Sequence, residues 1–304
     1  MTAAAFNVFS TMDTKFVDTL QTFISQGVSG VSQALTGPLS AMLTIYVVSY
    51  GILIMRGMVT EPVMEFAVRC MKVGVILMLV RNASDYNTYV TQVFFTDLPA
   101  TLGNALSGGS ATSSTTSIAS SFDNLLGQGW SSAVDIWAKA GWDASMIING
   151  LVSIAVILLT SAVSALGYVV SLYARVALSV ALALGPAFIA CAMFQSTRRF
   201  TETWIGKLVN YVILQVLTVA ISSLVLSVIT SIINVALSDV LQTAMAVIAI
   251  CFAAAYIFVQ LPGIASALAA GGAALNMGTP MQHGANAASR GATTIMNKVK
   301  GAVS

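Results

Sequence analysis

Apolar residues occur in long runs with few charges, separated by polar stretches. The runs cover residues 35–55, 63–80, 146–171, 176–194, 208–236 and 243–261. A helix needs about 20 apolar residues to cross the hydrocarbon core of a bilayer. The pattern predicts an all-α, polytopic membrane protein with about five crossings, in which 176–194 either re-enters the membrane or crosses it a sixth time.

Residues 1–34 have a different pattern, because polar and apolar positions alternate at helical spacing. Phe9, Phe16 and Phe23 fall on one side, and Asp13 and Asp18 fall on the others. This is typical of an amphipathic helix. We expect it to lie in the periplasmic interface or on a partner helix, or to be a surface helix of the protein's own bundle.

The stretch from 82 to 145 separates the first two spans, within 35–81, from the rest. It is predicted to be a hydrophilic periplasmic loop with a flexible linker, since ten of the fifteen residues in 107–121 are Ser or Thr. The segment that follows has helical periodicity and contains Trp130, Trp137 and Trp142. These tryptophans indicate a membrane interface or a docking surface for a partner.

The remaining organisation follows from the last apolar runs. Residues 146–262 are predicted to form the core membrane bundle, and 263–304 a basic cytoplasmic tail rich in Gly and Ala.

Only 8% of the 304 residues are charged and 57% are hydrophobic, whereas soluble domains contain about 25% charged residues. The composition therefore excludes a water-soluble globular protein.

The residues needed for chemistry are scarce. His283 is the only histidine, and Cys70, Cys191 and Cys251 fall in different apolar runs, so no metal cluster is expected. The chain contains no Walker motif or HExxH helix. We therefore predict no catalytic residue, no cofactor and no metal, and a function other than that of an enzyme.

The second span contains three charged residues on one face, Glu65, Arg69 and Lys72. Charges at the middle of a bilayer are costly and suggest function. Here Glu65 can pair with Arg69, four residues later. The side chains of Arg69 and Lys72 can extend to the membrane interface beside the turn that precedes this span. The alternative is a stripe that faces a subunit contact or a polar lumen.

The distribution of basic residues predicts the orientation, since Lys and Arg accumulate on the cytoplasmic side. The stretch 82–145 has one lysine and five aspartates, a net charge of −4, whereas 172–207 and the tail after Leu261 each have +3. All regions fall on their expected side if 176–194 bends back at Gly185 and Pro186. The N-terminus is then periplasmic and the C-terminus cytoplasmic.

The run from 175 to 207 resembles the core of the TrbL-like family, the polytopic inner-membrane subunits of type IV secretion and conjugation systems. A basic residue precedes an apolar stretch with a Gly-Pro-x-Phe motif, and an Arg-x-Phe-x-x-x-Trp sequence follows. The residues that carry the resemblance are Arg175, Gly185, Pro186, Phe194, Arg198, Phe200 and Trp204.

The resemblance implies a compact, Vir-type subunit of the bacterial inner membrane that assists the transfer of DNA-protein or protein substrates. Its implied partners are secretion ATPases, pilins, inner-membrane and periplasmic scaffold proteins, membrane lipids, further copies of the chain and, transiently, the translocated DNA or protein. Two alternatives remain: an immunity-type protein that excludes a competing machine, and a small-solute transporter.

One segment is the main candidate for an interaction site. Arg198, Arg199 and Lys207, with Phe200 and Trp204, are predicted to form a basic, aromatic surface at the cytoplasmic face. Such a surface can hold anionic lipid headgroups, or it can contact an ATPase or the phosphates of a passing strand.

Overall fold

The computed structural model describes residues 6–57, 62–106, 116–138, 145–194, 196–234 and 240–270. Every regular element within these ranges is helical, and none is a strand. The all-α prediction is confirmed. The elements are α1 (Val8–Met55), α2 (Pro62–Arg81), α3 (Ala83–Tyr86), the π-helical η1 (Asn87–Thr91) and η2 (Val93–Asp97), α4 (Leu98–Leu106), α5 (Thr116–Ala138), α6 (Ser145–Ala183), α7 (Gly185–Ala190), the 3-10 helix η3 (Cys191–Met193), α8 (Arg198–Asn234) and α9 (Val240–Ala269).

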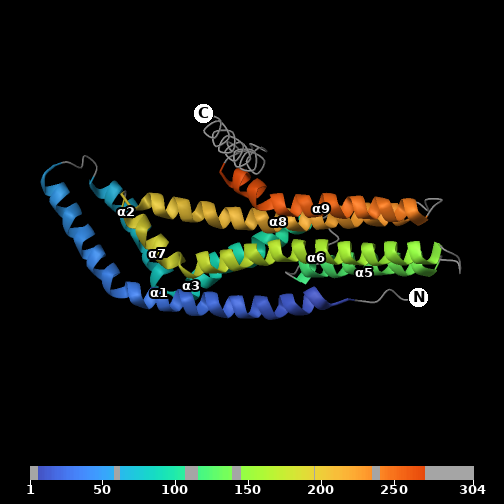
Figure 1. Cartoon of the computed structure of the whole chain (residues 1–304). Helices are drawn as coiled ribbons and strands as arrows, with labels where there is room; N and C mark the ends of the chain where they lie inside the picture. The colour runs from blue at the N-terminus through green and yellow to red at the C-terminus, as the bar shows by residue number, and fades with distance from the viewer. Residues whose placement is uncertain are drawn as a thin grey trace, which may run out of the picture.

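The long helices form an elongated bundle (Figure 1). α5, α6, α8 and α9 pack side by side, and the first half of α1 lies along α5 and α6. α7 and η3 connect α6 to α8, so that these two helices run antiparallel. The chain therefore reverses direction at the Gly-Pro sequence, where the bend was predicted.

α1 joins two segments that were predicted to be separate. It is a single helix of 48 residues, so the amphipathic segment continues directly into the first predicted span. Its first half buries Ile24 and Val28, as a surface helix of the bundle does. Pro38 lies inside the helix, and the second half of α1 bends away from the bundle (Figure 1).

The stretch predicted as a loop, 82–145, is largely helical in its described part. It contains α3, the two π-helical segments, α4 and α5. The reason is visible in α5, where Phe122, Leu125 and Ile136 recur at helical spacing and are buried in the bundle. Most of the Ser/Thr linker, 107–115, lies outside the described residues.

Four helices in the described part of the chain are long and apolar enough to cross a membrane: Val8–Met55, Gly150–Ala183, Arg198–Ser231 and Ala244–Ala269. The chain is therefore a multi-pass membrane protein. α2 is not among these four helices, and its 20 residues contain Glu65, Arg69 and Lys72. The count of about five crossings stays a prediction that depends on α2.

α6 corrects one boundary of the sequence analysis. The predicted span 146–171 and the first half of 176–194 form one helix of 39 residues. The separating charge, Arg175, is buried in an ion pair with Asp13, so the helix continues through it.

The lengths of α6 and α8 exceed what a bilayer can cover. At about 1.5 Å per residue, the 39 residues of α6 extend over roughly 58 Å, whereas the hydrocarbon core is about 30 Å thick. Even at a tilt of about 40°, only roughly 26 residues lie within that thickness. Part of each helix must therefore lie outside the hydrocarbon core.

Two apolar clusters form the interior. One joins α5, α6, α8 and α9 around residues such as Phe122 and Phe258. The other joins α1, α2, α3, the end of α6, α7 and the start of α8, and it includes Leu182, Trp204 and Leu208. The second cluster surrounds the break between α6 and α7.

Candidate functional site

The break between α6 and α7 is stabilised by a tyrosine from a distant part of the chain. Proline has no N–H, so Pro186 leaves the carbonyl of Leu182, four residues earlier, without its helical donor. The hydroxyl of Tyr86 donates a hydrogen bond to this oxygen at 2.8 Å. Tyr86 is fully buried. The cost of an open carbonyl inside the bundle is thereby avoided.

A tryptophan from α8 completes the same arrangement. The indole Nε1 of Trp204 donates to the carbonyl of Ala181 at 2.9 Å. Its ring stacks on Phe188 of α7, with centroids 6.0 Å apart and planes 11° from parallel. The side chain therefore contacts α6 and α7 at once and fixes the start of α8 against the break.

Gly185 is required by this close packing. A Cβ atom at this position would overlap the hydroxyl of Tyr86 and lie 2.9 Å from Cζ2 of Trp204. Separations below 3.0 Å do not occur for real Cβ atoms, so a neighbour would have to move. We call Tyr86, Gly185, Pro186, Phe188 and Trp204 the junction cluster.

The turn that leads into α8 has its own polar contacts. Thr201 donates from Oγ1 to the carbonyl of Phe188 at 2.6 Å, and Thr197 does the same to Cys191 at 2.6 Å. The ring of Phe194 lies against Tyr46 of α1, with centroids 6.2 Å apart. The turn is therefore connected to α1 as well as to α7.

The predicted basic surface is only partly as expected. Arg198 pairs with Glu202 at 2.9 Å, and both side chains are 60% exposed, so the pair contributes at most about 1 kcal/mol. Arg199, Phe200 and Lys207 are exposed. Trp204 does not belong to this surface, because it is buried in the junction cluster. We call Arg198, Arg199, Phe200 and Lys207 the basic face.

Arg175 lies apart from the basic face. It is buried and forms an ion pair with Asp13 of α1. A second carboxylate fixes the start of α1, since Asp123 of α5 accepts hydrogen bonds from the backbone N–H of Phe9 and Ser10, each at 2.9 Å. A carboxylate at a helix N-terminus is favourable. We call Asp13, Asp123 and Arg175 the α1 anchor.

Of the other predicted residues, those whose side chains the structure describes lie outside these clusters. Trp130 and Trp137 are exposed on α5, and the ring of Trp130 contacts Phe6. Lys72 is exposed on α2. Trp142 and the side chains of Glu65 and Arg69 lie outside the described part of the structure.

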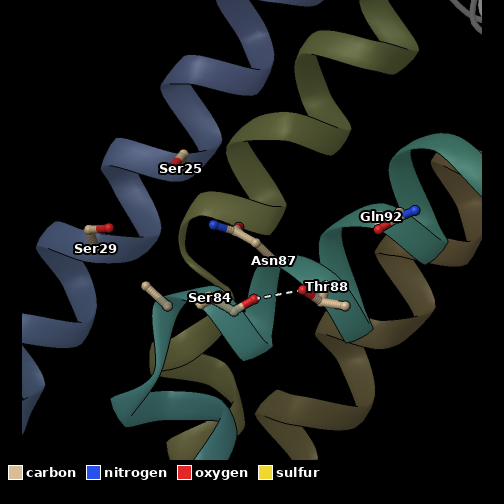
Figure 2. A pocket seen from close by; sticks show the side chains of 7 residues that line it. Ser25, Ser29, Ser84, Asn87, Thr88 and Gln92 are labelled. Atoms are coloured by element: carbon tan, nitrogen blue, oxygen red, sulfur yellow. Dashed lines mark hydrogen bonds between the residues drawn. The ribbon is translucent and has the colours of Figure 1, made fainter.

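A polar groove lies between α1 and the π-helical segment. Its volume is about 470 Å³, and Figure 2 shows hydroxyl and amide side chains along it, with Thr88 bonded to the carbonyl of Ser84. None of its lining residues is charged, and within the described ranges no three His, Cys, Asp or Glu side chains are placed to hold a metal ion. The lining residues are Ser25, Ser29, Ala83, Ser84, Asn87, Thr88 and Gln92.

Sequence reasoning missed several of the residues that hold the site together. Tyr86 and Asp123 gave no signal, because both lie in a stretch predicted as a loop. Asp13 appeared as one polar residue of an amphipathic helix. Thr201 lies inside the motif that carries the resemblance and could have been included.

Comparison with known proteins places the chain among conjugation and secretion proteins. The family described as "TrbL/VirB6 plasmid conjugal transfer protein" matches residues 43–261, which include the whole junction from α6 to α8. The "Type IV secretion system protein VirB6" of Bartonella quintana is 32% identical over 278 residues, which cover 91% of this chain and 84% of that protein.

Two further relatives have the same description. The protein from Bartonella henselae is also 32% identical over 278 residues. The protein from Brucella abortus biovar 1 is 27% identical over 194 residues, which cover 60% of this chain and 53% of that protein.

Proposed function

Because the chain belongs to the TrbL/VirB6 family, we propose that it is an inner-membrane channel or scaffold subunit of a type IV secretion system. In this role it assists the transfer of DNA-protein or protein substrates across the envelope, and the assembly of the machine or its pilus. The observation that carries the proposal is a family match extending through the junction cluster. The subunit is proposed to have a structural role and no catalytic one.

The partners follow from this assignment. As a type IV secretion component, the chain works with other secretion subunits. We propose that these include secretion ATPases, pilins, inner-membrane and periplasmic scaffold proteins and further copies of the chain. The exposed apolar side chains along α6 and α9 provide surface for lipid and for subunit contacts.

The proposed orientation has a periplasmic N-terminus and a cytoplasmic C-terminus. The end of α1, the start of α2 and the start of α8 lie at one end of the molecule (Figure 1). Arg56 lies at the end of α1, and Arg198 and Arg199 begin α8. Basic residues collected at one end favour a cytoplasmic location for that end.

This orientation predicts the labelling of a cysteine at position 199. In a variant without the native cysteines, Arg199→Cys should resist a membrane-impermeant thiol reagent in intact cells and react after the inner membrane is opened. Arg199 is exposed, so burial would not explain the protection. Labelling in intact cells with a permeable outer membrane would contradict the orientation.

The basic face is proposed to bind at the cytoplasmic surface of the membrane, either to anionic lipid or to an ATPase. Replacing both Arg198 and Arg199 by Ala should lower substrate transfer roughly tenfold or more, since each cation near an anionic surface contributes about 1 kcal/mol. The amount of protein in the membrane should not change, because both side chains are exposed. Lys15→Ala, an exposed cation on α1, is the control. Normal transfer by the double variant would exclude a role for the two arginines.

A further inference from the structure

The polar groove has two walls, one on α1 and one on the segment that begins with α3 (Figure 2). The first wall presents Ser25 and Ser29, and the second presents Ser84, Thr88 and Gln92. Within each wall these residues recur every four positions, and residues four apart lie on the same face of a helix. The groove is therefore lined by two rows of short polar side chains, which enclose about 470 Å³.

The second wall has an unusual backbone. It contains two π-helical segments in succession, Asn87–Thr91 and Val93–Asp97, whereas π-helical turns mostly occur singly within α-helices and are frequent at functional sites. The Oδ1 of Asn87 accepts a hydrogen bond from the hydroxyl of Thr91 at 3.1 Å. The Nδ2 of Asn87 is turned toward α1 (Figure 2). The π-helical wall thus places an amide donor in the groove.

The composition of the lining excludes several classes of ligand. None of the described lining residues is charged, so a phosphate or a metal ion would find no countercharge there. None of them is aromatic, so a nucleic-acid base would find no ring on which to stack. Ala83 is the one apolar residue among them, which is too little to bury the apolar face of a helix. The ligand that suits this lining is neutral and both donates and accepts hydrogen bonds.

The spacing of the rows matches the repeat of an extended peptide. Ser25 and Ser29 are separated by about 6 Å along α1, because each residue of a helix rises 1.5 Å. An extended chain rises about 3.3 Å per residue and presents its N–H and C=O groups to one side at every second residue, about 6.6 Å apart. Hydroxyl and amide side chains can pair with both kinds of group. The two rows can therefore bind the two edges of one extended chain.

We infer that the polar groove binds an extended, uncharged segment of a partner protein through the main chain of that segment. The row from Ser84 to Gln92 is long enough for about three to four extended residues. The groove also borders the junction cluster, since Asn87 directly follows Tyr86, whose hydroxyl bonds to the carbonyl of Leu182. A bound segment would contact the same turn that stabilises the break between α6 and α7.

A capped, uncharged hexapeptide of alternating serine and threonine is the probe for this site. Saturation-transfer difference NMR with the full chain in lipid nanodiscs should show saturable binding with a Kd of about 1 mM or tighter. The same peptide with every second backbone nitrogen methylated keeps its side chains but loses N–H donors, so it should bind at least about fivefold more weakly. No binding of the first peptide, or equal binding of the two, would overturn the inference. Saturable binding of maltohexaose without binding of the peptide would identify a sugar site instead.

Variants of both walls locate the binding. Ser25→Ala and Asn87→Leu should each weaken binding of the unmethylated peptide about fivefold, since each removes one hydrogen-bonding group. Thr19→Ala is the matched control, because Thr19 is an exposed hydroxyl residue of α1 that does not line the groove. Ser25 is exposed, so its substitution should leave the fold intact. Binding that neither groove variant alters would overturn the inference. The measurement uses purified protein, so its result is independent of the proposed role in secretion.

Discussion

Gly185→Ala should reduce substrate transfer several-fold and lower the thermal unfolding midpoint of the protein in detergent by roughly 5 °C. A Cβ atom at this position overlaps the Tyr86 hydroxyl and approaches Trp204, so both side chains must move. Overpacking of this kind costs about 1–3 kcal/mol, and a loss of this size changes the midpoint and the cellular amount of a protein measurably. The displacement also weakens the hydrogen bonds to Leu182 and Ala181.

Gly206→Ala is the matched control for this substitution. Gly206 lies on α8 two residues after Trp204, and a Cβ there would meet no atom within 4 Å. It should leave both transfer and unfolding unchanged, or stabilise α8 slightly, since Ala is the better helix former. A Gly185→Ala protein that unfolds and transfers like wild type would contradict the proposed packing of the junction cluster.

Arg175→Met should destabilise the bundle by about 3–5 kcal/mol, the typical cost of removing one partner of a buried ion pair. Asp13 would then be left charged inside the protein, where it is only 3% exposed. The amount of folded protein in the membrane should fall sharply. The measurement is the fraction that elutes as a monodisperse peak after extraction, together with its thermal unfolding midpoint.

The double variant Asp13→Asn with Arg175→Met should recover most of the folded protein, because it removes both charges. Arg198→Met, which breaks an exposed pair with Glu202, should change stability by less than about 1 kcal/mol. If the single Arg175 variant is as stable as wild type, Asp13 and Arg175 do not form the pair that anchors α1.

The helices of this protein could be predicted from sequence where apolar runs are long, and so could the break at Gly185 and Pro186. The continuity of α6 could not. A charged residue ordinarily ends a membrane span, and its counterpart, Asp13, lies 162 positions away. The ion pair that allows Arg175 to be buried depends on how α1 packs, which a local pattern does not contain.

The junction cluster shows the same limit. The motif indicated Trp204, but as part of an exposed basic surface with Arg198 and Arg199. Its actual position depends on carbonyls that Pro186 and the helix end leave without donors. Part of the helical content of 82–145 was missed for a related reason, since the apolar residues of this stretch are few and those that pack, such as Phe122, find their partners elsewhere in the chain.

The proposed role is tested most directly by deleting the gene separately from donor and recipient cells and measuring transfer of DNA or protein substrate between them. If the protein is a secretion subunit, deleting its gene from the donor should abolish transfer, and returning the wild-type gene should restore transfer. Deleting the gene from the recipient should have no effect on transfer. Normal transfer from the deleted donor would contradict the account, and loss of protection in the deleted recipient would instead identify an immunity-type protein.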